Sequence, residues 1–372
     1  MLKATPAGTR DLTTLPLFER FVRLREGVQW VPIGEWPTPV DDAPRFAKAH
    51  GLKTFHIKRE DMSHPECGGN KVRGLEFLLA EARRRDAKTL VTFSSAGSHH
   101  VCRTAYHGRK FRQNTVAVIV DQPNAEYVRR NLAAGLAAGA EYVLANKLTV
   151  LPKLLKQLQR NSSGNRAPCM YLPPGGTSPL SCIGQVNAAF ELRRQIDAGE
   201  LPMPDFIYVA LGSLGTAAGL ALGCRLAGIK TRVVGVVVSY KWYCTRGRWT
   251  RLANRTLGFM RKFDTSIPFA RVRPRDVSTV RTALGRGYAN FTERGVALAD
   301  EMRKLEQLQL DGAYTAKTLN GAMQYIERTH MQDAHHLFWN TYDAIPAANL
   351  PKSKIPPHLQ KYFSEPVQPF GG

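Results

Sequence analysis

The sequence predicts an α/β protein with largely parallel sheets. Candidate strands and candidate helices alternate along most of the chain, as they do in β-α-β units. Hydrophobic residues make up 43% of the sequence, which is ample for a packed core. The 372 residues exceed the usual size of a single core, so we expect two domains or one large α/β unit.

Seven apolar runs are the candidate strands, and helical stretches lie between them. The first helical stretch places Val72, Leu75 and Leu79 on one stripe, at the spacing of an amphipathic helix. We expect a loop at 159–168 and an extended, proline-rich tail at 348–372. The candidate strands cover 54–58, 89–93, 115–120, 141–145, 206–211, 231–238 and 336–340, and the helical stretches cover 71–85, 125–140, 179–196 and 216–228.

Two patterns argue against membrane and metal proteins. No run of about 18 apolar residues is present, so no transmembrane helix is predicted, and the first residues lack the apolar stretch of a signal peptide. We therefore expect a cytoplasmic protein that does not associate with membranes. The cysteines form no Cys-x-x-Cys pair, so neither a disulfide framework nor a metal site is expected, and the thiols should be reduced and mostly structural. They are Cys67, Cys102, Cys169, Cys182, Cys224 and Cys244.

The net charge of +22 predicts attraction to an anionic partner. Residues 241–286 contain twelve Lys or Arg and only two Asp, with aromatic residues interleaved among them. A surface that binds nucleic acid can have this composition. A solvated basic segment without a ligand is the simpler interpretation.

Lys71 stands at the start of the first predicted helix. Asn70 precedes it in the segment "CGGNKVRGLEF" (67–77) and is a residue type favoured at the N-cap, so Lys71 is expected in the first helical turn. The N-terminus of a helix already carries about half a positive charge, which makes it a poor place for an ammonium group. Chemistry that removes this charge would explain the placement.

A glycine-rich turn follows the candidate strand at 206–211. Glycines let the backbone approach an anion closely, and the amides at the start of the next helix point towards it. The turn lacks the Gly-Lys-Ser/Thr of a Walker loop and the glycine spacing of a dinucleotide-binding fingerprint. We predict a phosphate site here, with a tight turn that binds nothing as the alternative. The turn comprises Gly212, Ser213, Leu214, Gly215 and Thr216.

A third turn connects the candidate strand at 89–93 to the next helix. Ser98 stands in it, followed by His99 and His100, and the amides at the start of the helix would suit a carboxylate. The Ser98 hydroxyl could also serve as a reactive group. Ordinary helix capping by these residues is the alternative.

Together the three turns suit pyridoxal phosphate acting on an amino acid. A Schiff base would convert the Lys71 ammonium into an aldimine, and local positive potential eases the deprotonation that precedes it. The glycine-rich turn would hold the phosphate, and the turn at Ser98 would hold the substrate carboxylate. The glycine spacing disfavours a nicotinamide-dependent dehydrogenase.

Eight segments of the chain resemble, in order, the 1-aminocyclopropane-1-carboxylate deaminase and D-cysteine desulfhydrase family. These are fold-type II pyridoxal-phosphate enzymes, relatives of the tryptophan synthase β subunit. The resemblance runs from about Pro37 to about Pro346 and includes "GGNKVRGLEFLLAEA" and "GSLGTAAGL". The segments are 57–62, 68–82, 94–105, 174–192, 212–220, 287–295, 310–323 and 338–347.

The resemblance implies a tryptophan synthase β-like architecture. It has two open, twisted parallel-sheet domains with the cofactor between them, and it suggests a homodimer. The large cofactor-binding domain would comprise residues 1–74 and 186–372, and the small α/β domain would comprise 75–185.

Carried over residue by residue, the resemblance implies that Lys71 forms the internal aldimine. Asn70 and His99 would lie along the cofactor, and the glycine-rich turn would hold its phosphate. Ser98 matches the active-site serine, a nucleophile or proton carrier. The turn from Ser98 to His100 would bind the substrate carboxylate. His99 replaces the usual asparagine, and histidine titrates near neutrality.

The resemblance also implies roles for three residues in the segments 287–295 and 310–323. Tyr288 and Tyr314 match the two pocket tyrosines, and Thr315 falls where the partner of the pyridine nitrogen sits. In the deaminase branch the residue at this position is a glutamate, which would strengthen the electron sink. The threonine found here is similar to the residue in the desulfhydrase branch. Residues 340–343 depart from the usual "HTGG", so that side of the pocket should differ.

The expected reaction is a β-elimination like that of D-cysteine desulfhydrase, giving a keto acid, ammonia and sulfide. Lys71 or a neighbour would remove the α-proton. Three alternatives stay open. They are 1-aminocyclopropane-1-carboxylate ring opening, β-replacement with an anionic co-substrate, and a weakly catalytic protein that binds nucleic acid through its basic surface.

Overall fold

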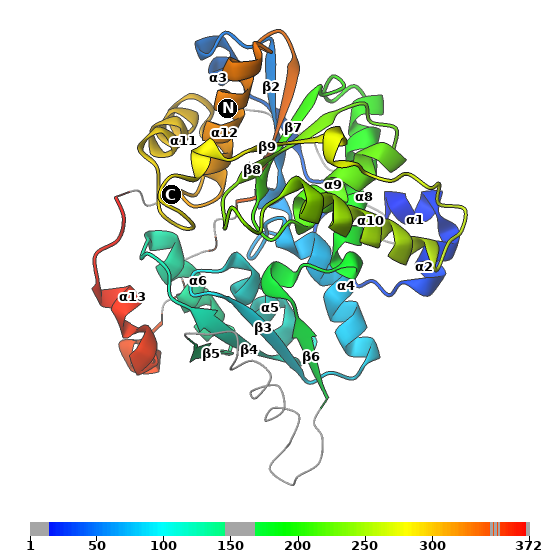
Figure 1. The fold of residues 1–372 in the computed structure, drawn as a ribbon. Helices are drawn as coiled ribbons and strands as arrows, with labels where there is room; N and C mark the ends of the chain where they lie inside the picture. The colour runs from blue at the N-terminus through cyan, green and yellow to red at the C-terminus, as the bar shows by residue number, and fades with distance from the viewer. Residues whose placement is uncertain (1–14, 146–167, 343–344, 346–347, 349, 370–372) are drawn as a thin grey trace.

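The structure is a computed structural model that describes residues 15–145, 168–342, 345, 348 and 350–369 (Figure 1). It contains a six-stranded sheet of order β1-β2-β10-β7-β8-β9 and a four-stranded sheet of order β5-β4-β3-β6. Every neighbouring pair with a defined register is parallel except β1 and β2, which are antiparallel. The predicted α/β class with two parallel sheets is confirmed.

All seven predicted strands are present, and three further strands were missed. The missed strands β1, β6 and β9 have three or four residues each and lie at the edges of the sheets. An edge strand this short carries too few apolar residues to form a recognisable run. The strands are β1 (Val40–Asp42), β2 (Thr54–Arg59), β3 (Thr89–Ser95), β4 (Asn114–Val120), β5 (Ala140–Leu144), β6 (Cys169–Leu172), β7 (Phe206–Leu211), β8 (Arg232–Val237), β9 (Val277–Val280) and β10 (His335–Asn340).

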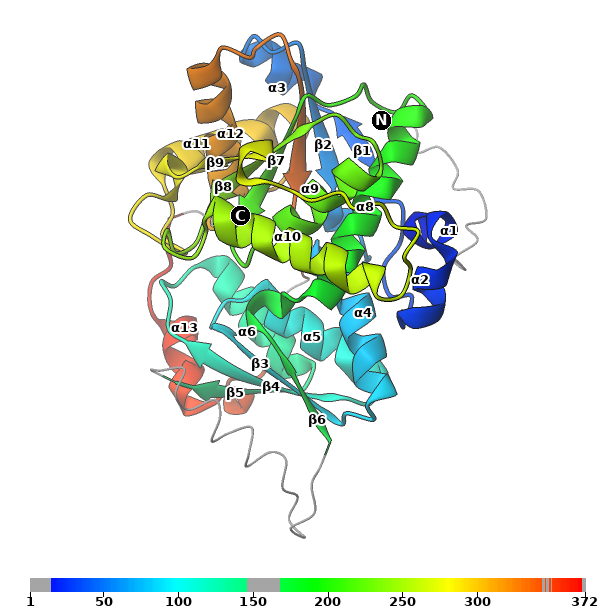
Figure 2. The same cartoon turned by 45° about the vertical axis from the view of Figure 1, so that its right-hand side comes forward.

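Helices cover both faces of the six-stranded sheet, as Figures 1 and 2 show. On β8, Val233 and Val237 pack into the core beneath α8, α9 and α10, while Val234 and Val236 pack towards α3, α11 and α12. This alternation is what a strand buried on both faces requires. The α-helices are α1 (Pro16–Arg20), α2 (Val22–Gly27), α3 (Pro44–Ala49), α4 (Lys71–Arg84), α5 (His99–Lys110), α6 (Glu126–Ala137), α8 (Pro179–Asp197), α9 (Gly215–Leu226), α10 (Arg246–Arg261), α11 (Glu293–Glu306), α12 (Thr315–Thr329) and α13 (Gln360–Ser364).

The C-terminal segment is not simply extended, which corrects that part of the expectation. It contains the short helix α13 and lies beside the four-stranded sheet (Figure 1). Ile355, Leu359 and Tyr362 are buried in the core that also contains α6. The Tyr362 hydroxyl donates a hydrogen bond to Asp121 at 2.8 Å. These apolar side chains make burial more favourable than extension into solvent. The predicted loop at 159–168 lies almost wholly outside the described residues.

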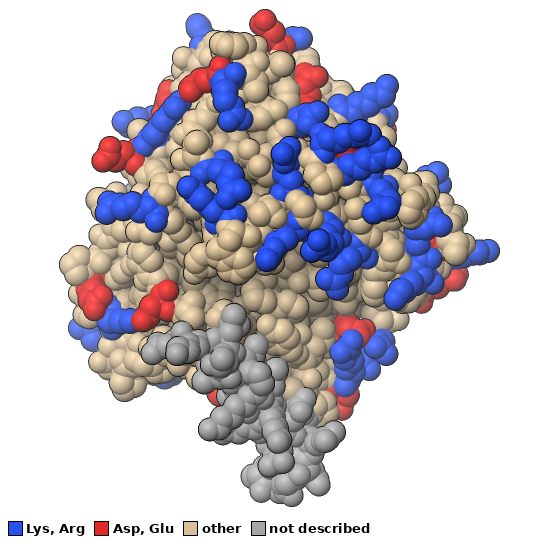
Figure 3. Space-filling model, viewed as in Figure 1, with Lys and Arg blue, Asp and Glu red and all other residues tan. Residues whose placement is uncertain are grey.

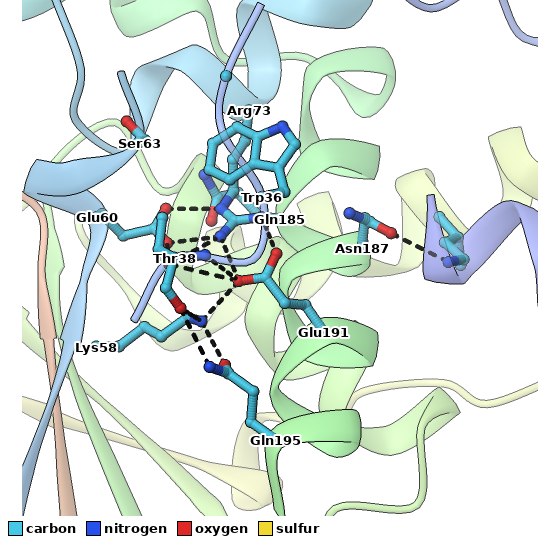
Figure 4. A network of polar contacts seen from close by, with 12 residues as sticks. Trp36, Thr38, Lys58, Glu60, Ser63, Arg73, Gln185, Asn187, Glu191 and Gln195 are labelled. Atoms are coloured by element: carbon cyan, nitrogen blue, oxygen red, sulfur yellow. Dashed lines mark hydrogen bonds and ion pairs between the residues drawn. The ribbon is translucent and has the colours of Figure 1, made fainter. Parts of the chain in front are cut away.

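A buried network of charged residues ties α4 to the six-stranded sheet (Figure 4). Arg73 lies between the carboxylates of Glu60 and Glu191, with nitrogen–oxygen distances of 2.7 to 2.9 Å. Lys58 on β2 donates to Glu191 at 2.6 Å. Burial alone would raise the pKa of Glu191, but Arg73 and Lys58 outweigh it and lower that pKa to about 2. The network fixes the first turn of α4, where Lys71 stands.

The basic segment 241–286 contains α10, an amphipathic helix. Trp249, Ala253 and Met260 on one side are buried, and Arg251 and Arg255 on the other are exposed. Figure 3 shows Lys and Arg side chains gathered on this face of the molecule. Within the described residues, no helix is long and apolar enough to span a membrane. Nucleic-acid binding by this surface stays an alternative hypothesis.

Candidate active site

A cavity of about 370 Å³ opens between the two sheets. The carboxyl ends of β3 and β7 and the first residues of α4, α5 and α9 contribute to its lining. Ligands bind at the carboxyl ends of strands in open α/β sheets, so this is the expected place for a site. Twelve residues predicted from the sequence line the cavity: Asn70, Lys71, Ser98, His99, His100, Gly212, Ser213, Leu214, Gly215, Thr216, Tyr288 and Tyr314.

Lys71 is the first residue of α4, as predicted. Its Nζ donates to the carbonyl of Gly175 at 3.1 Å and to Ser213 Oγ at 3.2 Å. Burial, helped by the positive charge of Arg103, lowers the pKa of Lys71 to about 8. The Asn70 side chain does not cap the helix, contrary to expectation; its Nδ2 donates instead to Thr216 Oγ1 at 2.7 Å. Asn70 therefore joins the start of α4 to the glycine-rich turn.

Loading of pyridoxal phosphate, the cofactor that the sequence predicts, should depend on pH with a midpoint near 8. A lysine must lose its proton before it can attack an aldehyde, and the pKa of Lys71 is lowered from 10.5 to about 8. The rate at which apoprotein takes up pyridoxal phosphate should therefore rise with pH and level off above about 8. Stopped-flow absorption at a series of pH values measures this rate. A rate still rising steeply from pH 9 to 10 would show an unperturbed lysine.

The glycine-rich turn forms a compact cradle at the start of α9. Leu214 has a positive φ of 74°, and this bend brings the chain into the helix at Gly215. The first amides of an α-helix have no acceptor within the helix, so they are available to an anion. Thr177 Oγ1 donates to Ser213 Oγ at 2.7 Å. A Cβ on Gly175 would lie 2.7 Å from Ser213 Oγ, so only glycine fits against the turn.

The start of α5 forms the second side of the cavity. Ser98 occupies the N-cap position, and its side chain makes no capping hydrogen bond to the helix. Burial and the charges of Arg103 and Lys71 lower the pKa of His99 well below its usual range. Burial and Lys71 lower the pKa of His100 to about 3. Both rings are therefore neutral at pH 7, which corrects the expectation that His99 titrates near neutrality.

Three hydroxyl groups are linked in the third side of the cavity. Tyr288 OH lies 2.5 Å from Tyr314 OH and 2.7 Å from Ser95 Oγ. Burial raises the pKa of Tyr288 and raises that of Tyr314 well above its usual value. The two tyrosines therefore stay protonated at neutral pH. The His99 ring lies 5.4 Å from the Tyr314 ring, which joins this side to α5.

Thr315 is not among the residues that line the cavity. It is fully buried, and its hydroxyl donates to the Asp311 carboxylate at 2.8 Å. That carboxylate also accepts from the amides of Ala313 and Tyr314, so Asp311 and Thr315 together fix the start of α12. Thr341, next to the carboxyl end of β10, lines the cavity instead.

Several lining residues were not predicted from the sequence. Ser95 lies two residues beyond the end of the predicted strand at 89–93, and the adjacent glycines of "PPGGT" (173–177) could have marked a second close backbone approach. The aromatic residues Tyr240, Trp242 and Tyr243 also line the cavity. They follow the carboxyl end of β8, just as the glycine-rich turn follows that of β7. Because β7 and β8 are neighbouring parallel strands, this position in the sequence could have identified them as lining residues.

The cavity has the parts that an aldehyde cofactor with a phosphate requires: a partly buried lysine, a glycine cradle at the start of α9 and a second helix start, that of α5. The family model "Pyridoxal-phosphate dependent enzyme" matches residues 31–341, most of the chain. The chain belongs to this family. Its cofactor is pyridoxal phosphate, and the fold is the fold-type II architecture.

Two related sequences and one solved structure are similar to the chain over most of its length. Nocardicin C-9' epimerase of Nocardia uniformis subsp. tsuyamanensis is 30% identical over 89% of this chain and 98% of its own length. D-cysteine desulfhydrase of Klebsiella pneumoniae is 28% identical over 80% of this chain and 88% of its own. The crystal structure of a 1-aminocyclopropane-1-carboxylate deaminase homologue superposes with a TM-score of 0.74 at 23% identity, covering 94% of this chain and 98% of that one.

The residues present fit pyridoxal phosphate. The cradle beside Ser213 would be filled by a Cβ at Gly175 and is open only because that residue is glycine. The Nε2 atom of His100 is buried and has no hydrogen-bond partner within the described residues, so it is available to a bound group. Hydroxyl and amide donors surround the start of α9, which is the donor set that a phosphate prefers.

Proposed function

We propose that the protein catalyses β-elimination from an amino acid, with D-cysteine as the simplest substrate and a keto acid, ammonia and sulfide as products. The observation that carries the proposal is the position of Lys71. Its amine stands between the glycine cradle and the start of α5, with a pKa lowered to about 8. When bound, the cofactor would supply an electron sink that stabilises negative charge at the substrate α-carbon.

The starts of α9 and α5 would bind different groups, the cofactor phosphate and the substrate carboxylate. The amides of Gly215 and Thr216, with the hydroxyls of Ser213 and Thr216, would hold the phosphate through the positive end of α9. Asn70 would orient this cradle through its hydrogen bond to Thr216. The turn from Ser98 to His100 would hold the substrate carboxylate at the positive end of α5.

Lys71 and the tyrosine pair would handle the protons. Because the pKa of Lys71 is about 8, its Nζ is partly neutral under mildly alkaline conditions and can accept the α-proton. Tyr288 and Tyr314 stay protonated and can donate hydrogen bonds to a developing negative charge. Ser98 and Ser95 would be the nearby hydroxyls through which a proton could pass.

The lack of acidic side chains among the described lining residues supports elimination rather than cyclopropane ring opening. Among the described residues that line it, none is Asp or Glu. A carboxylate beside the pyridine nitrogen would strengthen the electron sink. Opening of the cyclopropane ring needs more stabilisation of negative charge by the cofactor than the departure of a thiolate does. Thr341 supplies a hydroxyl at the cavity wall, whereas the resemblance implied that Thr315 is the partner of the pyridine nitrogen.

Purified protein loaded with pyridoxal phosphate should release sulfide and keto acid from D-cysteine in equal amounts. Sulfide is measured colorimetrically, and keto acid is measured with a coupled reductase. 1-Aminocyclopropane-1-carboxylate, tested in parallel, should give no keto acid above background. Keto acid from the cyclopropane substrate, with none from D-cysteine, would contradict the proposal.

A further inference from the structure

Four aromatic rings form a row from the inside of the cavity to its mouth. The Tyr314 and Tyr288 ring centres are 6.0 Å apart. Tyr288 stacks on Tyr240 at 6.3 Å, and Tyr240 lies 6.2 Å from Trp242. Tyr240 is 54% exposed and Trp242 is 66% exposed, although both line the cavity. Large aromatic side chains left exposed at a cavity mouth indicate a binding surface.

This aromatic rim, comprising Tyr240, Trp242 and Tyr243, is held in place by its surroundings. The Sγ of Cys244 donates to the carbonyl of Gly212 at 3.2 Å, which anchors the rim to the glycine-rich turn. The Arg248 guanidinium lies 5.2 Å from the centre of the Trp242 ring and 5.3 Å from that of Tyr243. A cation over these rings restrains them, so the rim is formed before a ligand arrives.

The rim faces the one part of an amino-acid substrate that the rest of the site leaves unassigned. The amine belongs at Lys71 and the carboxylate at the turn from Ser98 to His100, so the side chain is left to extend along the aromatic row. Hydrogen sulfide, the leaving group of free cysteine, is too small to reach from the reacting carbon to Trp242 at the surface. An aromatic substituent on the leaving atom would extend the substrate towards the aromatic row, where its ring can stack on these side chains.

We propose that the substrate is a cysteine that carries an aromatic substituent on sulfur. This inference rests on the proposed β-elimination. In that reaction the α-proton goes to Lys71 Nζ, the bond between Cβ and sulfur breaks, and its electron pair leaves with sulfur as an aryl thiolate. The remaining three-carbon enamine takes up water and gives pyruvate and ammonia. The aromatic rim holds the departing aryl group.

Turnover of two substrates tests the rim. With holoenzyme, kcat/KM is measured for S-phenyl-D-cysteine and for D-cysteine, and the ratio of the two is compared between variants. Trp242→Ala should lower this ratio by about 3- to 10-fold, the effect of losing one aromatic contact. Phe269→Ala is the matched control, because Phe269 is also exposed (72%) and also lies under an arginine, Arg261, but does not line the cavity. It should leave the ratio unchanged.

Binding of two analogues that cannot eliminate separates the rim from the reaction. D-Homophenylalanine has a methylene in place of the sulfur of S-phenyl-D-cysteine, and D-2-aminobutyrate has a methyl group in place of the thiol of D-cysteine. Their Kd values are read from the shift of the holoenzyme absorption band. The aryl analogue should bind about tenfold more tightly, and Trp242→Ala should remove most of this advantage. Equal Kd values, or an advantage that survives in Trp242→Ala, would overturn the inference.

The two proposals fail in different ways. If the aryl analogue binds more tightly through Trp242 but no thiolate is released from either cysteine, the proposed elimination is wrong and the rim inference stands. If D-cysteine is eliminated but the aryl analogue has no advantage, the rim inference is wrong and the elimination stands.

Discussion

Lys71→Ala should lower kcat for β-elimination by at least about 10³-fold, because the variant loses both the anchor of the cofactor and the acceptor of the α-proton. Its absorption band for covalently attached cofactor should be absent. The lysine lies at the surface of the cavity and not in a packed core, so the variant should keep the melting temperature of the apoprotein to within a few degrees. Turnover with D-cysteine and the visible spectrum measure the two effects.

Lys71→Arg is the matched variant, since it keeps a positive charge at the start of α4 but provides no amine that can bond the cofactor aldehyde. It should be as inactive as Lys71→Ala. Recovery of substantial activity by either variant would show that another residue carries the chemistry. Lys317 is the other lysine to test as the carrier of the cofactor, because burial lowers its pKa to about 8 as well. Its Nζ, however, donates to the carbonyls of Leu284 and Gly287 at 2.8 Å each, and it does not line the cavity.

Glu191→Gln should destabilise the fold by about 3–5 kcal/mol, the usual cost of breaking a buried ion pair by changing one partner. Glu191 accepts from Arg73 through both carboxylate oxygens, from Lys58 and from the amide of Thr38 at 3.0 Å. Among the described residues drawn in this network, the variant leaves Glu60 as the one counter-charge for two buried cations (Figure 4). The free energy of unfolding, measured in urea on apoprotein, gives the effect.

Asp197→Asn on the same helix is the control for Glu191→Gln. Asp197 pairs with Arg193 at 2.6 Å, and both side chains are exposed, so the loss should be below about 1 kcal/mol. Similar losses in the two variants would show that the buried network contributes no more than a surface ion pair does. In that case another feature would have to hold the first turn of α4.

The central strands and the turns beyond them could be predicted from the sequence because local patterns determine them. β7 and β8 are long apolar runs, and each is followed by a turn at the edge where ligands bind. Glycines mark the close backbone approach at the proposed phosphate cradle without any knowledge of tertiary contacts. The edge strand β1, by contrast, consists of Val40 and two aspartates, and only its pairing with β2 makes it a strand.

Side-chain directions could not be predicted, because they depend on distant parts of the chain. Asparagine is a favoured N-cap residue, yet the side-chain amide of Asn70 makes no capping hydrogen bond to its own helix. It donates instead to Thr216, 146 residues further along the chain. Thr315 turns to the Asp311 carboxylate four residues before it and leaves the cavity wall to Thr341. The neutral state of His99 follows from burial among Arg103 and Lys71, which no local pattern reveals.

The most direct test is to locate the lysine that carries the cofactor. Holoenzyme is reduced with sodium borohydride, which makes the bond between cofactor and lysine permanent, and then digested and mapped by mass spectrometry. We expect one pyridoxyl group, on the peptide that contains Lys71, and a folded Lys71→Ala protein without label. A pyridoxyl group on Lys58 or Lys317, or no label on the loaded wild-type protein, would contradict the assignment of Lys71.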